Sequence, residues 1–199
     1  MNRGGPITFA VMMDSRRKRS MEELGRLSPR EFADAKKTPL CLILDDIRSA
    51  NNVGSLFRTA DGFALQHLHL CGITATPPHR DILKTALGAT ASVSWSYHAD
   101  CVQLVKELMG AGAQVQCLEQ THASTSLHAF RVTDPLPLYL VVGNEVKGVS
   151  QNIIDAATGT IEIQQYGTKH SLNVAVSAGM AVWELSRQLR SGSPEKTPL

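Results

Sequence analysis

The sequence lacks the features that would place this chain in a membrane or send it out of the cell. No apolar run approaches the roughly 20 residues that a helix needs to span a bilayer. A short apolar patch near the start is followed by a basic run at residues 16–19, where a signal peptide would have its small-residue cleavage site. We therefore predict a cytoplasmic protein with no membrane contact.

Cysteine is scarce, and its spacing fits neither a zinc site nor a disulfide framework. The four cysteines are Cys41, Cys71, Cys101 and Cys117, and no two of them form a C-x-x-C pair. Three of the four fall in segments typical of strands. We predict that all four are buried free thiols, and we expect the protein to need no metal.

Several widespread nucleotide-binding and catalytic motifs are also missing. No G-x-G-x-x-G follows the first predicted strand, which argues against a dinucleotide-type Rossmann site. The patterns G-x-x-x-x-G-K-[ST], H-E-x-x-H and G-x-S-x-G do not occur either. These absences argue against a P-loop, a helical zinc-protease site and a hydrolase nucleophile elbow.

A strong net charge is lacking as well, but the distribution of charge is informative. The formal net charge of +2 over 199 residues is too small to indicate nucleic acid. Residues 1–38 contain 9 Lys and Arg against 5 Asp and Glu, whereas the remainder contains 11 against 13. Two interpretations of this basic segment stay open: a solvated, partly disordered arm, or an arm that follows phosphates.

From residue 40 onward, strand patterns alternate with helix patterns. Predicted strands cover residues 40–45, 67–72, 92–97, 114–119, 138–143 and 159–163, and predicted helices cover 53–64, 80–87, 100–112, 150–156 and 172–190. The alternation predicts an α/β fold, with a parallel sheet covered by helices on both faces. We divide the chain into a basic extension (1–38) with short helical pieces broken at Pro29, one domain (39–190) and a disordered tail (191–199).

Three polar clusters follow predicted strands, at residues 45–58, 143–150 and 164–173. Ligands of parallel sheets bind at the carboxyl ends of strands, so these clusters are candidate site segments. Structural explanations stay open for each of them. Asn51 or Asn52 would cap the helix that follows the first cluster, and Ser171 would cap the last helix.

Taken in order, the three clusters resemble a known set of motifs. "NNVGSLFRTA", "VVGNEVKGVS" and "IQQYGTKHSLNVAVSAG" are similar to the three signature motifs of the SpoU, or TrmH-like, branch of the SPOUT RNA methyltransferases. The resemblance covers about residues 40–190. It implies a deep trefoil knot near the C-terminus, S-adenosylmethionine as cofactor, and methyl transfer to a ribose 2′-hydroxyl of structured RNA. Of tRNA and rRNA, we slightly favour tRNA, because a compact chain with a basic arm would suffice.

The resemblance also implies roles for particular side chains. Asn52 and Arg58 match the first motif, Glu145 the second, and Ser171 and Asn173 the third. Arg58 is the proposed activator of the hydroxyl. A free guanidinium is too basic to accept a proton readily, so we favour electrostatic positioning and keep the general base as the alternative.

Backbone groups at Gly143, Ile163 and Leu172 are expected to hold the cofactor. Gln164 departs from many relatives, which have proline there. The family further implies a homodimer, and we expect Val182, Trp183 and Leu189 of the last helix to contribute to it, with the first-motif helix. The alternatives are an RNA-binding protein of the same knotted fold without methyltransferase activity, and a Rossmann-type methyltransferase.

Overall fold

The computed structural model describes residues 17–20, 22–134 and 137–191. The chain divides into two compact units, Met1–Asp34 and Ala35–Leu199. In the first unit, Pro29 follows a turn at residues 22–25 and opens helix α2 (Pro29–Asp34), so it starts a helix. The backbone amide of Ser28 donates to the carboxylate of Glu31 at 2.8 Å, which is half of a capping box. The predictions for residues 1–16 and 192–199 lie outside the described residues.

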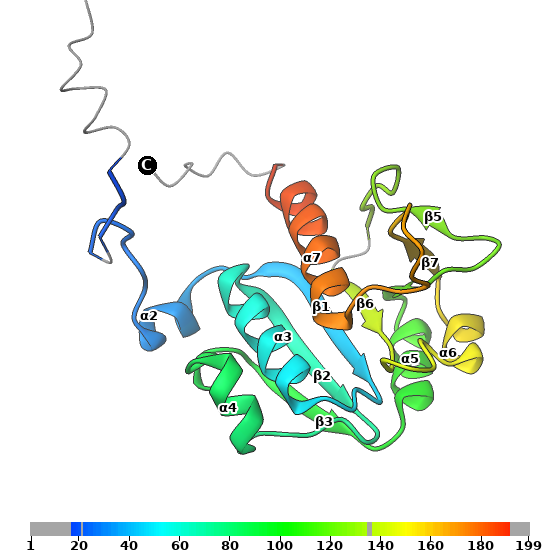
Figure 1. Cartoon of the computed structure of the whole chain (residues 1–199), viewed down its shortest axis with the longest axis horizontal. Coiled ribbons are helices and arrows are strands. Elements are labelled where there is room, and N and C mark those ends of the chain that lie inside the picture. Colours follow the sequence, from blue (N-terminus) through cyan, green and yellow to red (C-terminus); the bar gives the residue numbers. More distant parts are fainter. Residues whose placement is uncertain (1–16, 21, 135–136, 192–199) are drawn as a thin grey trace, which may run out of the picture. The chain divides into compact units, whose positions relative to one another are not determined.

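The second unit is built on one parallel sheet (Figure 1). Its strand order is β3-β2-β1-β6-β4-β7-β5, and every neighbouring pair is parallel. The strands are β1 (Thr38–Asp45), β2 (Leu65–Cys71), β3 (Trp95–His98), β4 (Gln114–Leu118), β5 (Thr125–Ser126), β6 (Leu138–Val142) and β7 (Gly159–Glu162). Strand β1 is buried along almost its whole length, as its continuous apolar run predicts.

Helices cover both faces of the sheet, which confirms the predicted fold class. They are α3 (Ala50–Gly62), α4 (Arg80–Ala86), α5 (Cys101–Gly110), α6 (Gln151–Ala156) and α7 (Val174–Ser191), with a short 3-10 helix η1 (Ala89–Ala91). Side chains alternate along a strand, so β1 serves two cores. Leu42 packs in the core that includes α3, α4 and α7, whereas Ile43 packs with α5 and α6.

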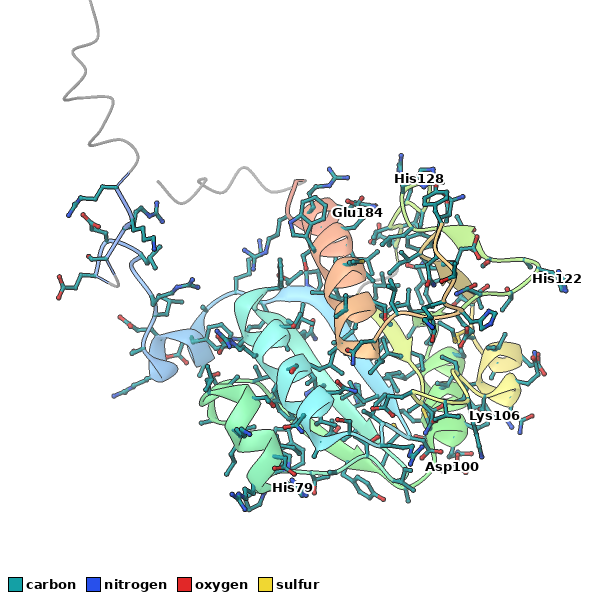
Figure 2. All side chains as sticks on the ribbon, viewed as in Figure 1. His79, Asp100, Lys106, His122, His128 and Glu184 are labelled. Carbon is teal, nitrogen blue, oxygen red and sulfur yellow. The ribbon has the colours of Figure 1, made fainter. Side chains whose placement is uncertain are left out.

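Most predicted elements are confirmed, and the differences lie at edges and ends. Strand β3 begins at Trp95, later than predicted, because η1 and its following turn occupy the residues before it. Strand β5 was not predicted, since two residues are too few for a periodic pattern. Asp100 caps α5 as expected, accepting a hydrogen bond from the Gln103 amide at 3.0 Å (Figure 2). The trefoil knot stays a prediction from the resemblance.

The four cysteines are buried and unpaired, as predicted. Burial raises the pKa of the Cys41 and Cys117 thiols to about 12, so these side chains behave as small apolar groups at neutral pH. Within the described part of the chain, no helix is both long and apolar enough to cross a membrane.

Candidate functional site

Side chains from three distant segments of the chain meet beyond the carboxyl ends of the strands. The Asn52 side-chain amide donates to Oε1 of Glu145 at 2.8 Å. The Asn173 side-chain amide donates in turn to Oδ1 of Asn52 at 3.2 Å. Glu145 and Asn173 are 93 and 121 residues away from Asn52 in the sequence. The fold therefore joins one residue from each of the three motifs in a single hydrogen-bonded row.

Glu145 belongs to the turn after β6, and its carboxylate lies next to the N-terminus of α3, from which it accepts hydrogen bonds. Its oxygens accept from the backbone amides of Arg48 and Ser49 at 2.9 and 3.0 Å, in addition to the Asn52 side chain. Partial burial alone would raise the pKa of Glu145, but the hydrogen bonds from Arg48 and Asn52 hold it below its ordinary value. A negative charge is favourable next to a helix N-terminus. Glu145 is thus a fixed carboxylate whose acceptor sites are largely occupied by the chain itself.

The helix caps differ from those predicted, and the difference frees a site residue. Ser49 caps α3, since its hydroxyl accepts from the Asn52 amide at 3.3 Å. The prediction that Asn51 or Asn52 is the cap is therefore wrong, and the Asn52 side chain is left to bond Glu145. The prediction that Ser171 caps α7 is also wrong. Asn173 is the cap, because its Oδ1 accepts a hydrogen bond from the Ala175 amide at 2.9 Å. Ser171 is exposed instead.

The segment after β6 folds into a tight turn that only glycine allows at two positions. Asn144 and Gly148 exchange backbone hydrogen bonds across this turn. The Asn144 side chain fastens the turn to the first motif by donating to the Asp46 carbonyl at 2.7 Å. A Cβ on Gly143 would lie 2.2 Å from the backbone of Gly148 and Val149. The turn leaves backbone groups close to one another and accessible from one side.

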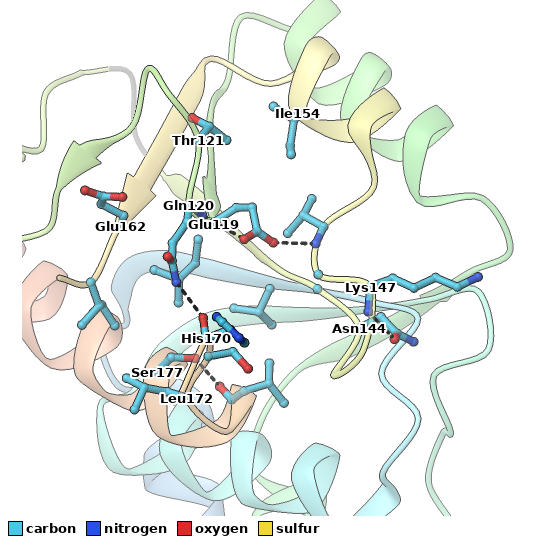
Figure 3. A pocket seen from close by; sticks show the side chains of 18 of the residues that line it. Glu119, Gln120, Thr121, Asn144, Lys147, Ile154, Glu162, His170, Leu172 and Ser177 are labelled. Carbon is cyan, nitrogen blue, oxygen red and sulfur yellow. Dashed lines mark hydrogen bonds between the residues drawn. The ribbon is translucent and has the colours of Figure 1, made fainter. Parts of the chain in front are cut away.

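A cavity of about 880 Å³ opens between the loops that follow β4, β6 and β7 (Figure 3). All three residues predicted to hold the cofactor, Gly143, Ile163 and Leu172, line it, together with Glu145 and Ser171. Its volume falls in the range of small-molecule sites, about 300–1,000 Å³.

The chemistry of this lining fits S-adenosylmethionine. Apolar side chains such as Leu118 and Ile154 offer contact area for a base, and the turn at residues 143–149 offers backbone donors and acceptors. Carboxylates and hydroxyls complete the lining for the polar part of the cofactor.

Arg58 is placed apart from this cavity. Among the described residues, those that line the cavity include none from α3. Arg58 is exposed and lines a second groove, of about 520 Å³, between α3 and α4. Lys84 and the hydroxyl residues Ser55, Thr59 and Thr85 line the same groove. Within the described chain, neither Arg58 nor Lys84 has a carboxylate partner, and no carboxylate lines the groove.

Sequence reasoning missed three residues of these sites. Glu119 follows β4 and lines the cavity, Asn144 fastens the turn after β6, and Lys84 lies opposite Arg58 in the second groove. Glu119 and Asn144 directly follow strands, where ligands of parallel sheets bind, so their positions alone could have identified them as candidate site residues. Lys84 lay in a predicted helix with no distinguishing pattern.

Sequence comparison shows which protein family and which curated proteins this chain resembles. A model of the SpoU rRNA Methylase family matches residues 39–183. The tRNA (guanosine(18)-2'-O)-methyltransferase of Aquifex aeolicus (strain VF5) is 28% identical over 165 residues, covering 80% of this chain and 74% of that protein. The 23S rRNA (guanosine-2'-O-)-methyltransferase RlmB of Neisseria meningitidis serogroup B is 30% identical over 155 residues, covering 75% of this chain and 59% of that protein. The chain thus spans less than two thirds of that second relative.

Solved structures agree with the sequence relatives. The TrmH/SpoU tRNA modifying enzyme of A. aeolicus has a TM-score of 0.73 and 26% identity, with 86% of this chain and 84% of that one covered. The AdoMet-bound rRNA methyltransferase of Sinorhizobium meliloti has a TM-score of 0.70 and 25% identity, with 82% of this chain and 62% of that one covered. The family model covers most of the chain, and one residue from each of the three motifs meets the others at one edge of the sheet. This chain belongs to the SpoU rRNA methylase family.

Proposed function

We propose that this protein transfers a methyl group from S-adenosylmethionine to a ribose 2′-hydroxyl of structured RNA. The observation that carries the proposal is the hydrogen-bonded row of Glu145, Asn52 and Asn173 next to a cavity lined by Gly143. Three separated motifs build one local structure there, and relatives that match this chain over most of its length are named as RNA 2'-O-methyltransferases.

The cavity is the proposed cofactor site. S-adenosylmethionine, when bound, supplies a methyl group already activated on a sulfonium. The chain has to bind and orient the donor, and the tight turn at residues 143–148 offers backbone groups for that purpose. Ser171 offers a hydroxyl from the segment before α7, and the row through Asn52 joins the starts of α3 and α7 beside the cavity.

Arg58 is the proposed contact to the RNA. Its guanidinium is exposed, and with Lys84 it gives the groove between α3 and α4 two positive charges and no carboxylate among the described lining residues. A planar guanidinium binds phosphate oxygens in a bidentate way, and a cation near the 2′-oxygen stabilises the negative charge that develops there. Electrostatic positioning therefore remains our preferred role for Arg58, with the general base as the alternative.

We also propose that the protein acts as a homodimer through α7. Val176, Met180 and Trp183 are exposed by 49%, 45% and 57%, and their spacing of four and three residues puts them on one helix face. The contact residues expected from the sequence need correction. Val182 is fully buried and Leu189 packs against the core, so only Trp183 of those three is available.

The relatives include enzymes named for tRNA and for rRNA, and of these two substrate classes we propose tRNA. We propose the cytoplasm as the compartment, where the four free thiols would stay reduced.

The test uses the full chain with isotope-labelled S-adenosylmethionine and separate pools of unmodified tRNA and rRNA. Digestion to nucleosides followed by mass spectrometry should find label on a 2′-O-methylated nucleoside from one pool. Comparing RNA from a deletion strain with its parent then locates the nucleotide. Label on a base would overturn the proposed position of methylation. Absence of cofactor binding in a calorimetric titration would favour the alternative, an RNA-binding protein without activity.

A further inference from the structure

Glu119 holds a carboxylate inside the cavity at a fixed orientation. It directly follows β4, and its oxygens accept hydrogen bonds from two backbone amides (Figure 3). Oε1 accepts from Gln120 at 2.8 Å and Oε2 accepts from Val149 at 2.9 Å. Because these amides belong to the loops after β4 and β6, the carboxylate cannot rotate without losing a bond to one of them.

The neighbouring turn is shaped around this carboxylate. Gly148 has a φ of +69°, a conformation that side chains disfavour. A Cβ at Gly148 would lie 2.2 Å from Oε2 of Glu119. The backbone therefore approaches the carboxylate as closely as a glycine permits, and the turn and Glu119 form one unit of the cavity wall.

Glu119 also has more acceptor capacity to spare than Glu145, the second-motif carboxylate. A carboxylate can accept about four hydrogen bonds, and the described chain gives Glu119 one on each oxygen. Glu145 by contrast accepts from three donors at the start of α3. A pair of oxygens, each with a free acceptor position, matches two adjacent hydroxyls. In the cofactor, the adjacent hydroxyls are the 2′,3′-diol of the adenosyl ribose.

We propose that Glu119 receives the 2′,3′-diol of the cofactor's ribose and selects ribonucleosides over deoxyribonucleosides. Dinucleotide sites solve the same problem in the same place, with an acidic residue near the carboxyl end of a parallel strand that binds a ribose hydroxyl. The inference rests on the proposed function, since it requires the cavity to hold S-adenosylmethionine.

The test measures nucleoside discrimination rather than activity. Adenosine, 2′-deoxyadenosine and 3′-deoxyadenosine compete with S-adenosylhomocysteine for the full-length protein. Loss of one hydrogen bond to a charged group should weaken binding of each deoxynucleoside by about 10- to 100-fold relative to adenosine. In Glu119→Gln the preference over at least one of the two deoxynucleosides should fall to within about threefold, because the amide keeps one acceptor oxygen and replaces the other with an NH2 donor. Glu107→Gln, the same change on the exposed surface of α5, should keep the full preference.

Two outcomes overturn the proposal. One is equal binding of all three nucleosides by the wild-type protein. This measurement requires no variant, so it does not depend on whether a variant folds. The other is a folded Glu119→Gln that weakens all three by the same factor, since a residue that only fastens loops would do that. If Glu119→Gln does not fold, Glu119→Asp replaces it, and an unchanged preference there has the same meaning. Retained nucleoside discrimination without RNA methylation would count against the proposed function and leave this assignment intact.

Discussion

Gly143 shows at the scale of one residue how backbone shape determines the cavity. A Cβ at this position would lie 2.2 Å from the backbone of Gly148 and Val149, and backbone atoms cannot move aside as the end of a flexible side chain can. We expect Gly143→Val to abolish binding of S-adenosylhomocysteine in a calorimetric titration while the circular dichroism spectrum stays that of a folded α/β protein.

Gly110→Ala is the matched control, because nothing lies within 4 Å of a Cβ built there. It should bind like the wild type. A folded Gly143→Val with unchanged affinity would show that the turn is not part of the cofactor site.

Arg58 allows cofactor binding and chemistry to be separated, because it lies outside the cavity. Removing one electrostatic contact to a developing charge costs on the order of 100- to 1000-fold in rate. We expect Arg58→Ala to lose about that much in single-turnover methylation while its affinity for S-adenosylhomocysteine stays unchanged. Arg58→Lys should recover little, since an ammonium cannot reproduce the planar fork.

Lys106→Ala removes a cation from the exposed surface of α5 and serves as the control (Figure 2). A loss of cofactor affinity in Arg58→Ala that accounts for the whole fall in rate would place Arg58 in the cofactor site instead.

At the scale of the element, local patterns predicted most strands and helices but not the contacts between their ends. The apolar run of β1 and the cap at Asp100 were both readable from the sequence because they depend on neighbouring residues. The hydrogen bond from Asn173 to Asn52 could not be predicted in this way, because its two partners are 121 residues apart. The resemblance identified the site residues. Only the structure shows that Gly143 and Glu145 line the cavity whereas Arg58 lines a separate groove.

Strands β2 and β3 carry a polar network that makes stability depend on pH. The Ser96 hydroxyl contacts Nε2 of His67 at 2.9 Å and Nε2 of His98 at 2.8 Å, and Nδ1 of His69 lies 3.1 Å from His98. Tyr139 of β6 faces His69 with ring centroids 5.8 Å apart. Burial, with smaller effects from His67 and His98, lowers the pKa of His69 to about 3. Burial also lowers the pKa of His67.

The sign of the effect follows from these lowered pKa values. Below about pH 6.5 the unfolded imidazoles bind protons that the folded ones do not, so folding loses stability as pH falls from about 6.5 toward 3. We expect the urea midpoint to drop between pH 7 and pH 5, by an amount worth on the order of 1 kcal/mol for His69 after allowance for its partial exposure.

His69→Phe should flatten this dependence, whereas His122→Gln, at an exposed position in the loop between β4 and β5, should not (Figure 2). A midpoint that is level from pH 7 to pH 5 in the wild type would contradict the buried neutral network.

At the scale of the whole molecule, the surface that would join two copies is the exposed stripe of α7, formed by Val176, Met180 and Trp183. Trp183 is its largest member and is 57% exposed, an unfavourable position for an indole unless a partner covers it. We expect the wild type to sediment as a dimer at micromolar concentration and Trp183→Glu to sediment as a monomer, because the dimer would bury the introduced charge without a partner.

Ile73→Glu is the control for added charge on an exposed apolar residue, since Ile73 is 67% exposed in the segment after β2, outside the α7 stripe. It should stay dimeric. The family resemblance implies an RNA site at the subunit interface, so we expect the monomeric Trp183→Glu to lose methylation while it still binds S-adenosylhomocysteine in its own cavity. A Trp183→Glu variant that is monomeric yet fully active would show that one chain holds both the cofactor and the RNA. A variant that stays dimeric would move the interface away from α7.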